Sequence, residues 1–212
     1  MNGVIVIDKP QGFTSFDVVA VMRRACGQKK IGHTGTLDPM ATGVLPLLLG
    51  CATRAEPFLD DSGKEYEASF RFGFSTDTED TTGRVTAQSG VRVTREEILN
   101  RIPEFTGEIL QTPPMYSAVH KDGKRLYELA RQGVEVEREK RPVTITRLEL
   151  LAFDEERQEG RLAVACSKGT YIRTLCADLG LSCGSLGVMS ALRRTRAAGF
   201  GLDNGVSLEQ AG

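Results

Sequence analysis

Hydrophobic and polar residues alternate along several segments of the chain, and this period of two predicts strands. Strands are expected at residues 3–8, 64–74, 107–112, 143–153 and 161–167. Apolar residues spaced three or four positions apart predict helices between them. These helices are expected from residue 14 or 15 to about 27, and at residues 94–102, 124–132 and 171–179. Hairpin-like strands with interspersed helices favour an α+β fold.

Capping residues mark several of the expected helix boundaries. Thr94 lies three residues before Glu97, which is the capping-box pattern. Thr14 or Ser15 provides an N-terminal cap for the first helix. Gly180 follows the last expected helix, at a position where glycine often ends one.

Composition places the chain among ordinary globular proteins. Its 212 residues are 40% hydrophobic and 26% charged, which allows a substantial core. No apolar run approaches the roughly 18 residues that cross a bilayer, so no membrane span is expected. An acid and a lysine interrupt the apolar N-terminus, which predicts a strand rather than a secretory signal, and hence a cytoplasmic protein. The five cysteines are scattered without a C-x-x-C pair, so we expect reduced thiols and no metal site.

Residues 31–43 are too rich in Gly, Thr and Pro for regular structure, and they predict a long loop of the kind that is usually functional. Within this loop Asp38 precedes Pro39. Proline fixes its own φ and favours an extended conformation at the preceding residue, so the loop would project the Asp38 carboxylate. A carboxylate held in this way is a usable nucleophile. The alternative is that the Asp-Pro pair only makes a turn.

A second candidate segment is SKGTYIRT, residues 167–174, which places Tyr171 and Arg173 where a strand passes into a helix. In an extended stretch these two side chains share a face. An arginine beside Asp38 would favour the ionised carboxylate, and a tyrosine could line the pocket of an extruded base. The alternatives are a tyrosine of the core and an arginine in a surface ion pair.

Residues 113–142 are polar and basic, and we interpret them as an insertion. The net charge of the chain is −1, so binding of a nucleic acid would depend on local basic regions such as this one. The alternative is a solvated basic face. The basic residues of this segment are Lys121, Lys124, Arg125, Arg131, Arg138, Lys140 and Arg141.

The loop sequence GHTGTLDPMATGVLPLLLG resembles the catalytic motif of the TruB family, the bacterial tRNA pseudouridine-55 synthases. The resemblance extends over almost the whole chain. It also rests on GVIVIDKPQGFTSFDVV, KEYEASFRFGFSTDTEDTTG, PPMYSAVHKDGKRLYELARQG, CSKGTYIRTLCADLG and ALRRTRAAGF. The first motif is highly specific, and the order of all six is hard to obtain by chance.

The resemblance implies the pseudouridine synthase fold, with a mixed and largely antiparallel central sheet flanked by helices and loops. It implies that Asp38 attacks a flipped-out nucleotide, at the ribose or at the base, so that uridine becomes pseudouridine. Tyr66 matches a tyrosine that stacks on the target base, while Tyr171 and Arg173 match the pocket tyrosine and the arginine that pairs with the aspartate. Supporting and RNA-binding roles are implied for Lys9, His33, Lys121, Lys124, Arg125, Arg141 and Leu192.

The resemblance further implies a tRNA substrate, bound at the T-arm stem-loop and modified at position 55, with no cofactor, no metal and no obligate protein partner. We expect a monomer with one catalytic domain over residues 1–212, an RNA-clamping insertion at about 113–142, and no C-terminal PUA-type domain. Two alternatives stay open. One is a guide-RNA-dependent synthase of the archaeal and eukaryotic branch, and the other is a non-catalytic tRNA-binding chaperone.

Overall fold

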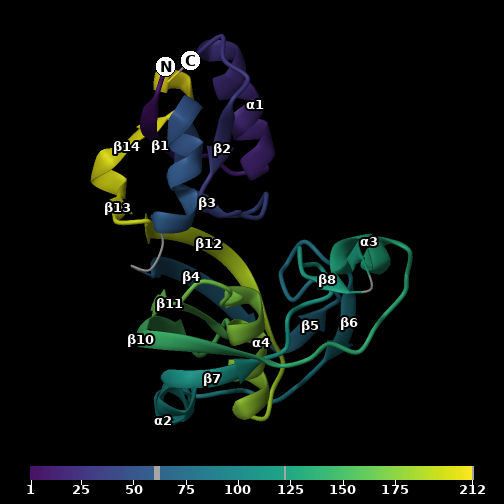
Figure 1. Ribbon diagram of the computed structural model, residues 1–212. Helices are drawn as coiled ribbons and strands as arrows, with labels where there is room; N and C mark the ends of the chain where they lie inside the picture. Colours follow the sequence, from purple (N-terminus) through teal and green to yellow (C-terminus); the bar gives the residue numbers. More distant parts are fainter. Residues whose placement is uncertain (60–62, 122, 212) are drawn as a thin grey trace. The chain divides into compact units, whose positions relative to one another are not determined.

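The computed structural model describes residues 1–59, 63–121 and 123–211 (Figure 1). Asp122, in the expected insertion, lies outside the described residues. The chain divides into two compact units. Unit 1 comprises Met1–Glu67, Val164–Lys168 and Ala191–Gly212, and unit 2 comprises Ala68–Ala163 and Gly169–Ser190. A single catalytic domain over the whole chain therefore stays a prediction.

Unit 1 is built around the buried strand β3 (Thr42–Leu49). β1 (Gly3–Lys9) and β2 (Ile31–His33) both pair antiparallel with it. The C-terminal part of β12 (Gly187–Ala197) runs parallel to β3, and Arg194 lies opposite Gly43. The short strands β14 (Gly205–Ser207) and β13 (Phe200–Gly201) complete the unit's sheet by pairing with β1 and β12.

Helix α1 (Ser15–Ala25) supplies the main core of unit 1. Thr14 caps it, and the side chains of Thr14 and Asp17 form a reciprocal capping box. The buried face of α1 packs against apolar side chains of β1, β2 and β3 in one cluster, formed by Ile7, Val18, Val19, Met22, Ile31, Leu45, Leu47 and Leu49. The predicted start of this helix is confirmed. Unit 1 also contains the 3-10 helices η1 (Gly50–Phe58) and η3 (Leu202–Asn204) and the short helix α5 (Leu208–Ala211).

Unit 2 contains most of β4 (Lys64–Phe72) and of β11 (Glu159–Cys166), and all of β10 (Arg141–Asp154) and β7 (Gly107–Gln111), in that order in the sheet. Phe70, Phe72 and Phe153 form an aromatic cluster, with ring centroids 4.7 to 5.9 Å apart. A Cβ at Gly160 would lie 2.3 Å from the Phe70 ring, so the absence of a side chain there lets the ring pack on the sheet. Helices α2 (Arg95–Arg101) and α4 (Ile172–Ser182), with the 3-10 helix η2 (Ile102–Phe105), belong to the same unit.

Three short elements lie in the expected insertion. β8 (His120–Lys121) and β9 (Lys124–Arg125) pair as a hairpin, and α3 (Leu126–Arg131) follows. The helix predicted from residue 124 therefore begins at Leu126, because the two residues before it pair with β8. The last two residues of the expected insertion, Arg141 and Pro142, belong to β10 instead, where they pair with β7.

The expected α+β fold with a mixed, largely antiparallel sheet is confirmed. Other predictions were wrong in detail. The expected loop 31–43 contains β2 and the first residues of β3, since pairing with β3 overrides the local Gly content. Gly180 lies inside α4 rather than after it, and a Cβ there would be 2.6 Å from the backbone nitrogen of Gly187. Sequence patterns missed β12 and the hairpin of β5 (Phe74–Thr76) with β6 (Val85–Gln88). Within the described residues no helix is both long enough and apolar enough to cross a bilayer.

Candidate active site

Asp38 lies in the segment between β2 and β3, and residues 34–41 are called the aspartate loop below. The loop turns at Asp38, whose carbonyl oxygen accepts a hydrogen bond from the Ala41 nitrogen at 3.0 Å. Pro39 therefore occupies the second position of a turn, where its fixed φ is favourable. The Asp-Pro pair therefore makes a turn in which Asp38 is only half-buried, and the role of Asp38 as a nucleophile stays a prediction.

The aspartate loop is fixed to α1 and to the end of β1. The buried Ser15 hydroxyl accepts a hydrogen bond from the Leu37 nitrogen at 2.8 Å and donates to the Leu37 oxygen at 3.2 Å. The Pro39 oxygen accepts hydrogen bonds from the Gly12 nitrogen at 2.8 Å and from the Lys9 ammonium at 3.4 Å. These bonds satisfy backbone groups on both sides of Asp38, so the loop is irregular but held in place.

Lys9 is fully buried beneath the aspartate loop. Its ammonium also donates to the backbone oxygens of Pro10 and Phe13. Burial lowers the pKa of Lys9 to about 8, the negative charge of Asp38 opposes that change, and the positive charge of Arg194 adds to it. Lys9 therefore lies within electrostatic range of both the Asp38 carboxylate and the Arg194 guanidinium. The expected supporting role of Lys9 is consistent with this position.

Arg194 was not predicted as a site residue, although the ALRRTRAAGF motif contains it. Its side chain is 1% exposed. The guanidinium donates to the Val44 oxygen at 2.7 Å, the Gly35 oxygen at 3.1 Å and the Thr36 oxygen at 3.4 Å. A buried arginine is rare unless its donors are satisfied, and backbone oxygens of the aspartate loop and β3 satisfy them here.

Three other predicted residues belong to unit 1. His33 ends β2; burial lowers its pKa, the charge of Arg194 lowers it further, and Glu56 opposes the change. Among the described residues its buried Nδ1 atom has no hydrogen-bond partner. Tyr66 on β4 and Leu192 on β12 are 8% and 9% exposed.

Unit 2 carries Tyr171 and Arg173 at the start of α4, where Tyr171 is the N-terminal cap residue. The Gln111 side chain accepts a hydrogen bond from the Tyr171 nitrogen at 3.0 Å and donates to the Tyr171 oxygen at 3.2 Å. These two hydrogen bonds to the backbone of Tyr171 fix the start of the helix. They thereby fix Arg173, two residues further on.

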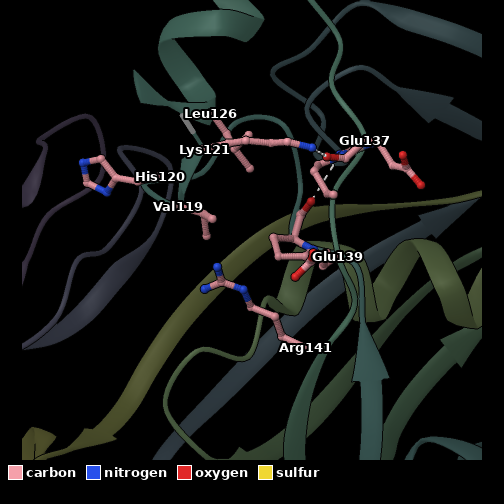
Figure 2. A pocket seen from close by; sticks show the side chains of 9 residues that line it. Val119, His120, Lys121, Leu126, Glu137, Glu139 and Arg141 are labelled. Carbon is pink, nitrogen blue, oxygen red and sulfur yellow. Dashed lines mark hydrogen bonds between the residues drawn. The ribbon is translucent and has the colours of Figure 1, made fainter. Parts of the chain in front are cut away.

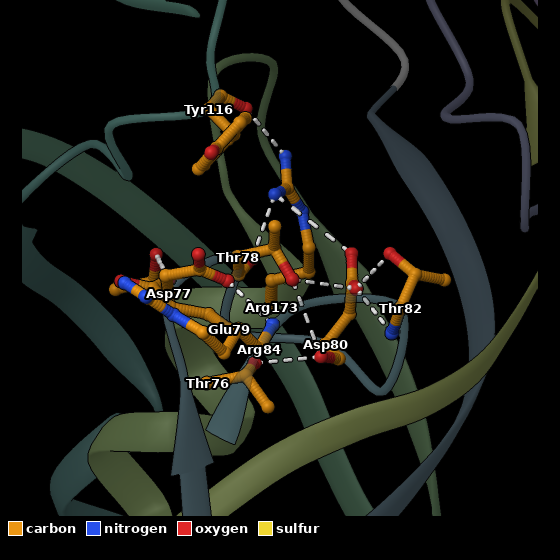
Figure 3. Close-up of polar contacts among 10 residues, drawn as sticks. Thr76, Asp77, Thr78, Glu79, Asp80, Thr82, Arg84, Tyr116 and Arg173 are labelled. Carbon is orange, nitrogen blue, oxygen red and sulfur yellow. Dashed lines mark hydrogen bonds and ion pairs between the residues drawn. The ribbon is translucent and has the colours of Figure 1, made fainter. Parts of the chain in front are cut away.

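Figure 3 shows how the buried Arg173 guanidinium is held. It donates to the Thr78 oxygen and to the Tyr116 oxygen, both at 2.8 Å, and it lies 3.9 Å from the Asp80 carboxylate. The nitrogen and hydroxyl of Thr82 donate to Asp80 at 2.9 and 2.6 Å. Asp80 was missed in the sequence, where it is one of several acids in a Thr-rich segment. Because two backbone oxygens and a carboxylate surround the Arg173 guanidinium, its position is well defined.

Glu79, next to Asp80, was missed for the same reason. It has a positive φ of 61°, and it accepts a hydrogen bond from the Thr174 hydroxyl at 2.6 Å. Burial raises its pKa, whereas the Thr174 bond and the Arg173 charge lower it. Glu79 thus ties the loop that carries Asp80 to the first turn of α4.

The insertion holds the other predicted basic residues. A cavity of about 190 Å³ opens there, and Figure 2 shows Lys121 and Arg141 on its wall together with Glu137 and Glu139. The Lys121 ammonium donates to the backbone oxygen of Glu137. The other residues that line this cavity are Pro113, Val119, His120, Leu126 and Arg138.

Lys124 and Arg125 lie on the exposed hairpin strand β9. The Arg125 guanidinium donates to the Tyr127 hydroxyl at 3.1 Å and lies 5.8 Å from the centre of that ring. This hairpin therefore presents cations beside an aromatic side chain.

Comparison with known proteins decides the family. The model of the TruB family pseudouridylate synthase N terminal domain matches residues 23–172, and that of the tRNA pseudouridylate synthase B C-terminal domain matches residues 173–211. The chain belongs to the TruB family. It is 50% identical to the tRNA pseudouridine synthase B of Alkaliphilus oremlandii, over 99% of this chain and 70% of that protein. It is 51% identical to that of Stutzerimonas stutzeri, over 99% and 68%.

Solved structures confirm the pseudouridine synthase fold. A chain from a Cbf5-Nop10-Gar1 complex matches with a TM-score of 0.76 and 34% identity over 98% of this chain. A chain from an H/ACA RNP bound to a substrate RNA containing 2′-deoxyuridine matches with a TM-score of 0.72 and 31% identity over 98%. The present chain spans about half the length of both, at 52% and 51%.

Five of the predicted site residues therefore fall into two groups. Lys9, His33 and Asp38 are gathered around the aspartate loop of unit 1, together with the unpredicted Arg194. Tyr171 and Arg173 are fixed at the start of α4 in unit 2. The pairing of Asp38 with Arg173, which the family resemblance implies, stays a prediction.

Proposed function

We propose that this chain isomerises uridine to pseudouridine at position 55 in the T-loop of tRNA, with the Asp38 carboxylate as its nucleophile. As a TruB family member the chain is a pseudouridine synthase, and relatives that share about half of its residues are named tRNA pseudouridine synthase B. The observation that carries the role of Asp38 is the aspartate loop itself. Its backbone is fixed on both sides of Asp38, and the residue is only half-buried.

The proposed reaction conserves every atom of uridine. Asp38 attacks the nucleotide, at the ribose or at the base, and the bond between N1 of uracil and the sugar breaks. The uracil then turns and forms a bond from its C5 to the same sugar carbon, and the bond between Asp38 and the nucleotide breaks, which restores the carboxylate. The C5 proton is lost, and N1 gains a proton. A carboxylate must be ionised to attack, so nearby fixed cations favour the reaction.

The remaining residues of the site have roles that follow from their chemistry. Arg173 supplies a fixed cation for Asp38, and its bonds to the Thr78 and Tyr116 oxygens support that role. Tyr66 stacks on the target base, and Tyr171 lines its pocket. Leu192 gives the pocket an apolar contact. A base must leave its stack to reach such a pocket, so the proposal includes base flipping, with His33 holding the flipped conformation.

RNA recognition is proposed for the insertion. Lys121, Lys124, Arg125 and Arg141 would neutralise phosphates of the T-arm stem-loop, and Tyr127 beside Arg125 offers a surface for a base. We further propose that the chain acts in the cytoplasm as a monomer without a protein partner. Light scattering of the free chain, and activity of the purified chain alone, test the last two points.

The decisive experiment measures pseudouridine formation in an unmodified tRNA transcript by the purified chain. Wild type is compared with Asp38→Asn, and with Asp203→Asn as a control, because Asp203 is exposed in η3. We expect product with wild type and the control and none with Asp38→Asn. Equal rates for wild type and Asp38→Asn would exclude Asp38 as the nucleophile.

A guide-dependent reaction is the second candidate, because the chain is similar to proteins solved in H/ACA assemblies. The same transcript separates the two candidates. Product without any added guide RNA supports the proposal above. Product that appears only when a guide RNA is supplied supports the second candidate, and tRNA binding without product under either condition supports a chaperone.

A further inference from the structure

One buried side chain spans the aspartate loop. The guanidinium of Arg194 donates to the Gly35 and Thr36 oxygens before Asp38 and to the Val44 oxygen after it. A guanidinium is planar, and its five N–H groups point in fixed directions. The three acceptors therefore cannot move apart without losing a bond, so Arg194 sets the separation between the two ends of the loop.

The location of Arg194 gives this contact its rigidity. The residue belongs to β12, which runs parallel to β3 with Arg194 opposite Gly43. A Cβ at Gly43 would lie only 2.1 Å from the Arg194 oxygen, so the two backbones are in close contact at this point. The Arg194 side chain thus starts from a fixed backbone and ends on the loop.

Ser15 holds the same loop from the α1 side. Its hydroxyl is buried and bonds both the nitrogen and the oxygen of Leu37, the residue before Asp38. The capping box of Thr14 and Asp17 fixes the start of α1 and hence the position of Ser15. The backbone that carries the carboxylate is therefore held between a helix start and a strand.

We propose that Arg194 is a positioning residue for the reaction, which holds the aspartate loop so that Asp38 reaches the target nucleotide, and that Ser15 is a second and weaker anchor. This inference rests on the proposed function, because it requires Asp38 to be the nucleophile. Displacing a reacting group by about 1 Å can lower a rate by about 100-fold without changing the binding of the substrate.

The test replaces the guanidinium group of Arg194 and keeps its positive charge. Arg194→Lys retains a cation, but its donors all leave one nitrogen, whereas Arg194 reaches the Val44, Thr36 and Gly35 oxygens from three separate nitrogens of a planar group. For each variant we would measure the single-turnover rate of pseudouridine formation at saturating chain, the Kd for the tRNA transcript and the free energy of unfolding in urea. We expect the rate per folded molecule to fall by about 10- to 100-fold with the Kd within about twofold of wild type. Arg196→Lys is the matched control, since Arg196 is exposed two residues further along β12.

The outcomes separate positioning from a merely structural role. A folded Arg194→Lys chain with the wild-type rate overturns the inference, and so does a rate that falls only as far as the folded fraction falls. If Arg194→Lys does not fold, Ser15→Ala decides, because a lower rate at unchanged Kd supports the inference and an unchanged rate overturns it. Failure of the proposed function would look different, since wild type would then be inactive or Asp38→Asn would be active.

Discussion

Gly43 offers the sharpest test of how the fold fixes the aspartate loop. It follows the loop in β3, and its φ is 103°, a conformation that residues with a side chain rarely adopt. A Cβ at this position would lie 2.1 Å from the oxygen and 2.9 Å from the nitrogen of Arg194. Because those atoms belong to the backbone of β12, no rotation of a side chain relieves the contact. We therefore predict that Gly43→Ala disturbs both the stability and the activity of the chain.

The expected change in the free energy of unfolding is the sum of two unfavourable contributions and one favourable contribution. Backbone strain at such a φ costs about 1–3 kcal/mol. Relief of the contact requires β3 and β12 to separate by more than about 1 Å, which weakens the pairing of Arg194 with Gly43 and moves the loop. Loss of unfolded-state entropy returns only about 0.4–1 kcal/mol. We expect a net loss of about 2 kcal/mol or more in the free energy of unfolding, and a rate lower by about 100-fold in the folded fraction.

Urea denaturation and single-turnover pseudouridine formation measure the two effects. Gly32→Ala is the matched control from the same motif, because its φ is not positive and an added Cβ meets nothing within 4 Å. The control should change stability by less than about 1 kcal/mol and leave the rate unchanged. Equal stability and equal rates for the Gly43 and Gly32 variants would refute the argument that close contact with β12 positions the loop.

Three further predictions concern charged side chains. Arg173→Lys replaces the two nitrogens that donate to the partly buried Thr78 and Tyr116 oxygens by a single one, so the free energy of unfolding in urea should fall by about 1–3 kcal/mol, and an unchanged value would contradict the described contacts. The pKa of Lys9 is lower in the folded chain, about 8 against 10.5, so its contribution to stability should rise between those pH values, by at most about 1.4 kcal/mol per pH unit. When the free energy of unfolding is measured from pH 7 to 10.5, this rise should be absent in Lys9→Met. Parallel curves for wild type and Lys9→Met would contradict the prediction. Replacing Lys121 and Lys124 by Ala should reduce the slope of log K for tRNA against log salt by about 1 to 2, and an identical slope would remove both residues from the RNA interface.

Sequence reasoning succeeded where the determining interactions are local. Thr14 and Thr94 cap α1 and α2 as predicted, and each forms a capping box with an acid three residues later. Such signals need only four consecutive residues, so they can be recognised without knowing the fold. The aspartate loop was predicted for a similar reason, since Pro39 restricts the chain locally.

Sequence reasoning failed where partners are distant in the chain. β12 has three consecutive buried residues, Gly187, Val188 and Met189, and a buried arginine, so it lacks the alternation that marks a strand. Its partner in unit 1 is β3, more than 100 residues earlier. The ion pair of Asp80 with Arg173 likewise joins α4 to a loop far away in sequence. Such pairs depend on the tertiary fold, and composition gives no sign of them.

Arg194 and Arg173 also share a property that bears on the chemistry. Both are buried, and both donate to backbone oxygens. A neutral oxygen satisfies a donor without cancelling the charge of the guanidinium, whereas a carboxylate partner offsets it. Arg194 brings a positive charge to the aspartate loop in addition to its geometry, and Asp80 offsets part of the charge of Arg173. Charge and geometry are lost together when arginine is replaced by methionine, so lysine is the substitution that separates them at both positions.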